Sequence, residues 1–237
     1  MKTYIVILVC AFLSLEINAQ SLVGAWEAIS TSENGQPIKT VIIFSESYQV
    51  FSTHNAKTGE FIHTTGGNWK TEDDLIIENV EFDSDAPDAV GKMVSFKFAI
   101  TDNTLKLEGF NSVFTRLDDG IPGKLQGAWL MSGRVRDGKI QSRSTDVPRK
   151  TMKILSGTRF QWIAYNTETK EFKGTGGGTY TTINNEYTEN ITFFSKDNSR
   201  VGQSLKFNFE LIDGNWHHTG LSSKGDPIHE IWSQRTK

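Results

Sequence analysis

Three of the five histidines lie between residues 216 and 230, and they are the residues best suited to move protons. Histidine changes its charge near neutral pH, so His217, His218 and His229 are candidate catalytic residues. Three imidazoles could instead hold zinc. Adjacent residues of a strand point to opposite faces, so His217 and His218 would not readily share one ion, and we expect no metal. A third interpretation treats all three as exposed hairpin residues.

A second group of polar residues lies on an expected strand near residue 187. Tyr187 and Glu189 are two positions apart, so their side chains share one face of the strand. If that face lines an interior, the carboxylate needs partners, which Arg159, Tyr165 or a histidine could provide. Alternatively, Glu189 bonds only the backbone or its strand neighbours.

Aromatic residues complete the candidate site. Tryptophan can stack on sugar rings, although packing in a core is its more common role. We therefore predict catalytic residues among the histidines, Tyr165 and Tyr187. The predicted substrate-binding residues are Arg159, Glu189, Glu230, Trp162, Trp216 and Trp232. The sequence contains no nucleotide-binding loop, paired-cysteine metal motif, Gly-x-Ser-x-Gly elbow or His-Glu-x-x-His motif.

The elements that position these residues belong to an internal repeat. Residues 39–101 align with residues 150–212 at a constant shift of 111, with 20 identities and no gap. The Leu22–Trp26 segment (LVGAW) returns as Leu125–Trp129 (LQGAW) at a shift of 103. The second copy therefore has eight extra residues before residue 150, and the match of Arg116 with Arg235 indicates eight more near the end. Fixed self-similarity of this kind indicates a duplicated structural unit.

Each copy has the pattern of an antiparallel β-domain. Apolar and polar residues alternate in segments such as Phe207–Leu211, turn-forming Asn-Gly and Asp-Gly pairs recur, and no segment has the period of an amphipathic helix. About eight short strands per copy, closed into a barrel, would leave no exposed sheet edge. We predict an all-β protein with barrels over residues 20–119 and 124–237, joined by a linker rich in glycine and proline.

The N-terminus reads as a separate targeting segment. Lys2 precedes an apolar run of eleven residues, and a polar stretch then ends at Ala19. Because a membrane-spanning helix needs ~20 apolar residues, we predict a signal peptide over residues 1–19 rather than a membrane anchor. The only cysteine, Cys10, lies inside this run, and no small residue precedes it, as a lipoprotein signal would require. The expected location is the bacterial periplasm or the medium, without disulfides.

The net charge of −3 and the absence of a basic run argue against nucleic acid as a partner.

The differences between the copies point to the second one as the functional half. In the alignment of the two copies, Glu78 corresponds to Glu189, but Ile76 corresponds to Tyr187. Tyr48 likewise corresponds to Arg159, and His54 to Tyr165.

Gly24-Ala25-Trp26 on a first strand and Arg116 on a last strand resemble the lipocalin (calycin) signature. In that superfamily the tryptophan closes one barrel end and a late arginine packs on its ring. Gly127-Ala128-Trp129 with Arg235 repeats the pattern, so the resemblance implies structural roles for both pairs. The second copy is also similar to lipocalin-like domains of secreted bacterial proteins, through Lys153–Ser156, Tyr187–Asn190 and His229–Trp232.

This resemblance implies a context of polysaccharide degradation, because similar tandem proteins occur beside glycan-degrading enzymes. The expected activity is that of a carbon–oxygen lyase, a dehydratase acting on oligosaccharides that contain uronic acid, with no cofactor. Arg159 would neutralise the substrate carboxylate, a histidine would be the base, and Tyr165 or Tyr187 the acid. The alternative is a lipocalin-like protein that binds a small molecule or glycan without chemistry.

Overall fold

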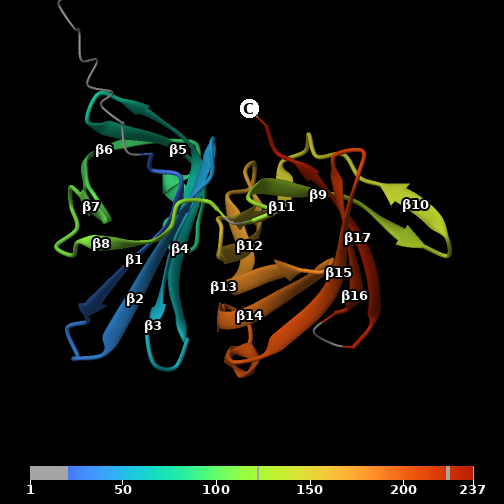
Figure 1. The fold of residues 1–237 in the computed structure, drawn as a ribbon. Helices are drawn as coiled ribbons and strands as arrows, with labels where there is room; N and C mark the ends of the chain where they lie inside the picture. The colour runs from blue at the N-terminus through green and yellow to red at the C-terminus, as the bar shows by residue number, and fades with distance from the viewer. Residues whose placement is uncertain (1–20, 122, 223–224, 237) are drawn as a thin grey trace, which may run out of the picture.

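The computed structural model describes residues 21–121, 123–222 and 225–236, which form two antiparallel β-barrels side by side (Figure 1). The predicted signal peptide lies outside the described residues. No helix within the described ranges is long and apolar enough to cross a membrane. The all-β prediction and the duplication of one barrel unit are thus confirmed.

The first barrel closes through eight strands in sequence order, with β1 paired to both β2 and β8. Neighbouring strands are antiparallel. Two-residue turns join β4 to β5 and β6 to β7, whereas the longer β5–β6 connection contains the short 3-10 helix η1 (Pro87–Ala89). The strands are β1 (Gly24–Thr31), β2 (Pro37–Phe44), β3 (Tyr48–Asn55), β4 (Phe61–Glu72), β5 (Leu75–Asp83), β6 (Met93–Thr101), β7 (Thr104–Leu107) and β8 (Phe114–Asp118).

The second barrel closes by pairing β9 with β17, and its extra strand β10 extends from β9 away from the first barrel (Figure 1). The first eight-residue insertion thus forms the β10 hairpin, and the second lengthens the last hairpin. The strands are β9 (Gly127–Arg136), β10 (Lys139–Ser142), β11 (Arg149–Leu155), β12 (Arg159–Asn166), β13 (Glu171–Ile183), β14 (Glu186–Phe194), β15 (Ser204–Ile212), β16 (Asn215–Leu221) and β17 (Pro227–Gln234).

Both barrels use the same bulge in the same place. The β4–β5 register shifts between Gly66 and Gly67, and the β13–β14 register shifts between Gly177 and Gly178. A Cβ atom on Gly67 would lie 1.9 Å from the Asn79 carbonyl oxygen, and one on Gly178 would lie 1.9 Å from that of Asn190. The repeated Gly-Gly pair is therefore required by a close backbone approach.

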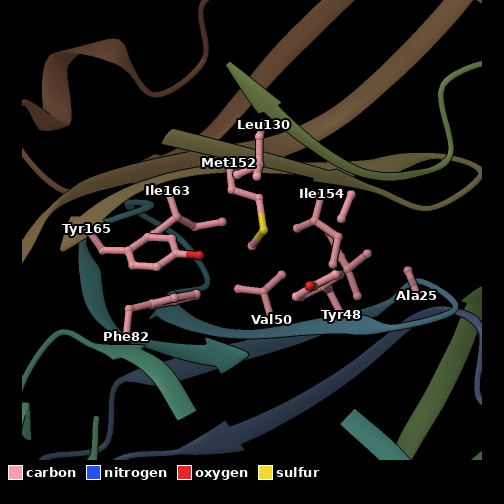
Figure 2. Packing of buried hydrophobic residues seen from close by; sticks show 11 residues of the cluster. Ala25, Tyr48, Val50, Phe82, Leu130, Met152, Ile154, Ile163 and Tyr165 are labelled. Carbon is pink, nitrogen blue, oxygen red and sulfur yellow. The ribbon is translucent and has the colours of Figure 1, made fainter. Parts of the chain in front are cut away.

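The outer walls of the two barrels pack into a common hydrophobic core (Figure 2). Because side chains of a strand alternate between faces, each wall strand has one apolar face for its barrel interior and one for the partner barrel. The two-sided burial explains the run of four consecutive apolar residues at the end of β2, Val41–Phe44. The contributors are Ala25, Ile43, Tyr48, Val50 and Phe82 from the first barrel, and Ala128, Leu130, Met152, Ile154, Ile163 and Tyr165 from the second.

Polar contacts fix the two barrels relative to each other. The Asp118 carboxylate, just before the linker, accepts hydrogen bonds from the side chains of Ser156 and Thr158 in the β11–β12 turn. Gln161 Nε2 donates to Thr64 Oγ1 across the interface at 2.9 Å. These contacts join turns and strand faces of both copies. The two barrels are therefore packed against each other as one unit.

The predicted stacking of arginine on tryptophan holds in the first barrel and is wrong in the second. The Arg116 guanidinium lies 4.0 Å from the Trp26 ring centroid, as expected. In the second barrel Trp129 pairs with Gln234, not with Arg235. A shift of one residue turns a side chain to the other face of the sheet. Arg235 therefore points out of its barrel, and its guanidinium lies 4.0 Å from the ring centroid of Tyr48 in the first barrel.

Candidate functional site

The interior of the second barrel contains a buried ion pair that has no counterpart in the first barrel. Lys153 Nζ lies 2.8 Å from Glu189 Oε1, and both side chains are 6% exposed. The hydroxyl of Tyr187 donates to the same carboxylate oxygen at 2.9 Å. Tyr187 and Glu189 thus share an inward face, as their spacing predicts, and the carboxylate has the partners that a buried charge requires.

Three aromatic rings surround the ammonium group of Lys153. Its Nζ lies 5.2 Å from the ring centroid of Tyr187, 4.9 Å from that of Trp216 and 5.2 Å from that of Trp232. A cation within ~6 Å of aromatic rings is stabilised by their quadrupoles. The site therefore holds a fixed positive charge deep in an apolar barrel.

His218 faces the same interior and has no hydrogen-bond partner among the described residues. It is 2% exposed, and its ring centroid lies 5.6 Å from that of Tyr187. In the described part of the chain, Nε2 of His218 and Nε1 of Trp216 have no hydrogen-bond partner, and Nδ1 of His218 has only a 3.4 Å contact with Glu230. Buried polar groups are nearly always hydrogen-bonded, and exceptions often mark functional positions.

Glu230 connects this cluster with solvent. Its Oε2 lies 3.4 Å from Nδ1 of His218 and accepts a hydrogen bond from Nε1 of Trp232 at 3.2 Å. The Glu230 side chain is 26% exposed, whereas His218 is 3% exposed by the same measure. The carboxylate thus marks the side on which the interior cluster opens to solvent.

The environment moves the pKa values of two neighbouring groups in opposite directions. Burial, and then the positive charge of Lys153, lower the pKa of His218 below its ordinary value. Burial, and then the negative charge of Glu189, raise the pKa of Tyr187 well above its ordinary value. At neutral pH His218 is therefore an uncharged base and Tyr187 a protonated donor. The imidazole can thus accept a proton and the phenol can donate one, each as a weaker base or acid than the free side chain.

The structure assembles part of the predicted site and separates the rest. The barrel interior brings together His218, Tyr187, Glu189, Glu230, Trp216 and Trp232, and Trp162 packs against the same aromatic cluster. His217 and His229 lie on the outer face, where Nδ1 of His217 is 3.0 Å from Nε2 of His229. All three histidines lie in the regular strands β16 and β17 rather than in a loop.

Two predicted residues lie between the barrels. The Tyr165 hydroxyl donates to Glu81 Oε2 at 2.6 Å and is fully buried there. Arg159 lines a cavity of about 70 Å³ together with Glu27 and Lys39 of the first barrel. Neither side chain belongs to the interior cluster, so the cation of that cluster is Lys153 and not Arg159.

Sequence reasoning missed Lys153 as a site residue, although a signal was present. Its counterpart at the shift of 111 is Ile42, a change from apolar to charged between the apolar residues Met152 and Ile154. Strand pairing identifies the counterpart of His218 in the first barrel. Phe209 pairs with His218, and its counterpart Phe98 pairs with Leu107, so Leu107 takes the place of His218.

The first barrel lacks the interior cluster. Ile42 and Ile76 replace Lys153 and Tyr187, and Leu107 occupies the position of His218. Glu78 alone remains, and burial raises its pKa to about 7. Among the described residues of this copy, apolar side chains therefore take the places of the cation and the imidazole beside the carboxyl group.

A larger cleft of about 670 Å³ lies at the junction of the barrels. The β2–β3 turn, the linker and the start of β9 form it, and Trp129, Gln126 and Gln234 are in its wall. No histidine is among the described residues that line this cleft.

Residues 124–237, the second barrel, match the model of a family described as a domain of unknown function (DUF4488). No curated protein matches the chain. Among solved structures, the crystal structure of the Cpx pathway activator NlpE from Escherichia coli is similar, with 11% identity and a TM-score of 0.26. That match covers 90% of this chain and 92% of the other. A TM-score this low supports no inference about function, and the fold assignment rests on the strand pairing described above.

Proposed function

We propose that the second barrel is a carbon–oxygen lyase, a dehydratase that removes water from a uronic acid at the end of an oligosaccharide. The observation that carries this proposal is His218, a buried imidazole whose Nε2 has no hydrogen-bond partner among the described residues, next to protonated Tyr187 and the cation Lys153. Elimination next to a carboxylate needs these three functions: a base, an acid and a positive charge.

Each residue of the cluster has one role in the proposed reaction. Lys153 holds the substrate carboxylate and stabilises the charge that develops on it. His218 takes the proton from the adjacent carbon, C5, and the C–H electron pair forms the C4–C5 double bond. The C4–O bond breaks, and the hydroxyl leaves as water with the proton of Tyr187. The proton on His218 then returns to the Tyr187 phenolate, so the protein is restored and no cofactor is needed.

Glu230 positions the base. Its carboxylate lies 3.4 Å from Nδ1 of His218 and is held by the indole of Trp232. A small rotation of either side chain would form a hydrogen bond that leaves Nε2 free to accept a proton, the orienting role that carboxylates have beside catalytic histidines. Trp162 and Trp216 supply aromatic surface for the sugar ring.

The test is incubation of the tag-free protein with oligosaccharides that end in a uronic acid with a free hydroxyl at C4. Turnover produces ultraviolet absorbance from the conjugated ene-carboxylate and the loss of one water in the mass spectrum. Removal of a general acid or base costs ~10²–10⁴-fold in rate. We therefore expect that much loss for His218→Gln and Tyr187→Phe.

His217→Gln is the matched control, because His217 is the next residue but faces the other side of the wall. It should retain the activity and the thermal unfolding midpoint of the wild type. Absence of product from every uronate glycan tested, or an equal loss in His217→Gln and His218→Gln, would reject the lyase proposal.

A second candidate is binding without chemistry. The observation that favours it is the set of unpartnered nitrogens on Trp216 and His218 within an aromatic enclosure, since pockets commonly combine apolar walls with a few converging polar groups. Calorimetry with the same glycans separates the two: saturable binding that needs Lys153, with no product, supports a binding protein. Either activity fits our proposal that the chain is exported to the periplasm or the medium and acts during polysaccharide degradation.

A further inference from the structure

The outer face of the second barrel carries two histidines that face each other across strands β16 and β17. Nδ1 of His217 and Nε2 of His229 are 3.0 Å apart, and the two rings are inclined by 65°. Both residues are partly exposed. His218, which follows His217 in β16, is buried on the other face of the strand. Ions in solution can therefore reach this pair without entering the barrel.

The backbone fixes the spacing of the pair. His217 pairs with Ile231, and Thr219 pairs with His229, so the two imidazoles are diagonal neighbours on one face. Side chains in this relation can touch across an antiparallel pair. Both strands belong to a closed barrel, so little conformational freedom is lost when the two nitrogens act together.

We propose that His217 and His229 form a two-imidazole site for a divalent copper ion. In the free protein one nitrogen donates a hydrogen bond to the other. A neutral imidazole can move its proton to its second nitrogen, so a metal can replace the bridging proton and bind both lone pairs. Imidazole is a common ligand for copper, nickel and zinc.

The distance between the nitrogens in the metal-free protein is nearer to the separation that copper or nickel needs than to the one that zinc needs. Two nitrogens 3.0 Å apart, each ~2.0 Å from one ion, subtend an angle of about 97°. That angle suits neighbouring positions of a tetragonal ion such as Cu²⁺ or Ni²⁺. Tetrahedral zinc needs about 109°, which requires a separation of about 3.3 Å at the same bond length. Copper also binds imidazole more tightly than nickel or zinc does.

The remaining ligands would be water. Within the described residues no cluster of three or more histidine, cysteine, aspartate or glutamate residues could hold a metal, so this site offers two protein ligands. The site lies on the other side of the barrel wall from the proposed lyase cluster and does not depend on it.

The test is titration of the tag-free full chain with Cu²⁺ in the presence of glycine as a competing chelator. Calorimetry should give one ion per chain, and electron paramagnetic resonance should show a tetragonal ion with nitrogen ligands. Loss of groups that only orient a metal ligand costs ~10–100-fold in affinity, so His217→Ala or His229→Ala should each weaken binding more than about tenfold.

His63→Ala is the matched control, because His63 is also a partly buried strand histidine but pairs with Asp83 in the first barrel. It should bind copper as the wild type does. Equal copper affinity in the wild type and either of the two histidine variants would overturn the proposal, as would zinc affinity equal to that of copper. Circular dichroism of the metal-free variants confirms that each is folded.

Discussion

The ion pair between Glu81 and Arg235 joins the two barrels, and its removal should destabilise the whole protein. Arg235 Nη1 lies 2.8 Å from one carboxylate oxygen of Glu81, and Nη2 lies 2.9 Å from the other. The side chains are 11% and 10% exposed. The Tyr165 hydroxyl donates to the same carboxylate at 2.6 Å, so the pair is bidentate and almost fully enclosed.

The change Arg235→Met tests this contact. It removes the cation but keeps the apolar stem that packs near Tyr48. Glu81 would then stay buried as an unpaired carboxylate, and breaking a buried pair in this way costs ~3–5 kcal/mol. For a chain of this size 1 kcal/mol corresponds to ~2–4 °C, so we expect the unfolding midpoint to fall by about 6–20 °C.

Urea unfolding followed by tryptophan fluorescence, together with calorimetry, measures the effect. The double variant Glu81→Gln/Arg235→Met removes both charges, so it should be more stable than Arg235→Met alone. Lys173→Met is the control, because Lys173 forms an ion pair with Glu171 at the surface, and exposed pairs contribute little. The reasoning fails if Arg235→Met changes stability no more than Lys173→Met does.

Two further predictions concern the first barrel and the repeated bulge. Burial raises the pKa of Glu78 to about 7, so the folded state holds a proton that the unfolded chain releases above its ordinary value near 4.5. The contribution of Glu78 to stability should thus fall by ~3 kcal/mol as pH rises from about 4.5 to 7. Burial lowers the pKa of His54 to about 4, so its contribution has the opposite sign between about pH 4 and 6.5, and the variant must be compared with the wild type. Glu78→Gln should remove the Glu78 contribution, so in urea unfolding at several pH values the stability of the variant relative to the wild type should rise between pH 4.5 and 7. A difference that does not change with pH would contradict the assignment. Gly67→Ala places a Cβ 1.9 Å from a carbonyl oxygen, so it should lower the unfolding midpoint far more than Lys173→Met does. A midpoint within 1 °C of the wild type, on the scale of ~2–4 °C per kcal/mol, would show that the bulge tolerates a side chain.

Much of the candidate site could be predicted from residue spacing alone. Tyr187 and Glu189 share an inward face because a strand repeats every two residues, and His217 and His218 take opposite faces for the same reason. Spacing cannot say which of two faces is the interior when both are buried. The walls between the barrels are buried on both sides, and for this reason Tyr165 was assigned to the site although it belongs to the interface.

The sequence by itself determined that one strand-forming unit was duplicated, that each copy is an antiparallel barrel and that the second copy carries the polar interior. These properties depend on local alternation, turn residues and self-similarity, which neighbouring residues encode. Only the tertiary structure decided that Lys153 is the interior cation and that Arg235 pairs with Glu81 instead of packing on Trp129. Those outcomes depend on the register at the closing β9–β17 pair and on contacts between distant segments. A shift of one residue there exchanges the two faces, and no local pattern specifies that shift.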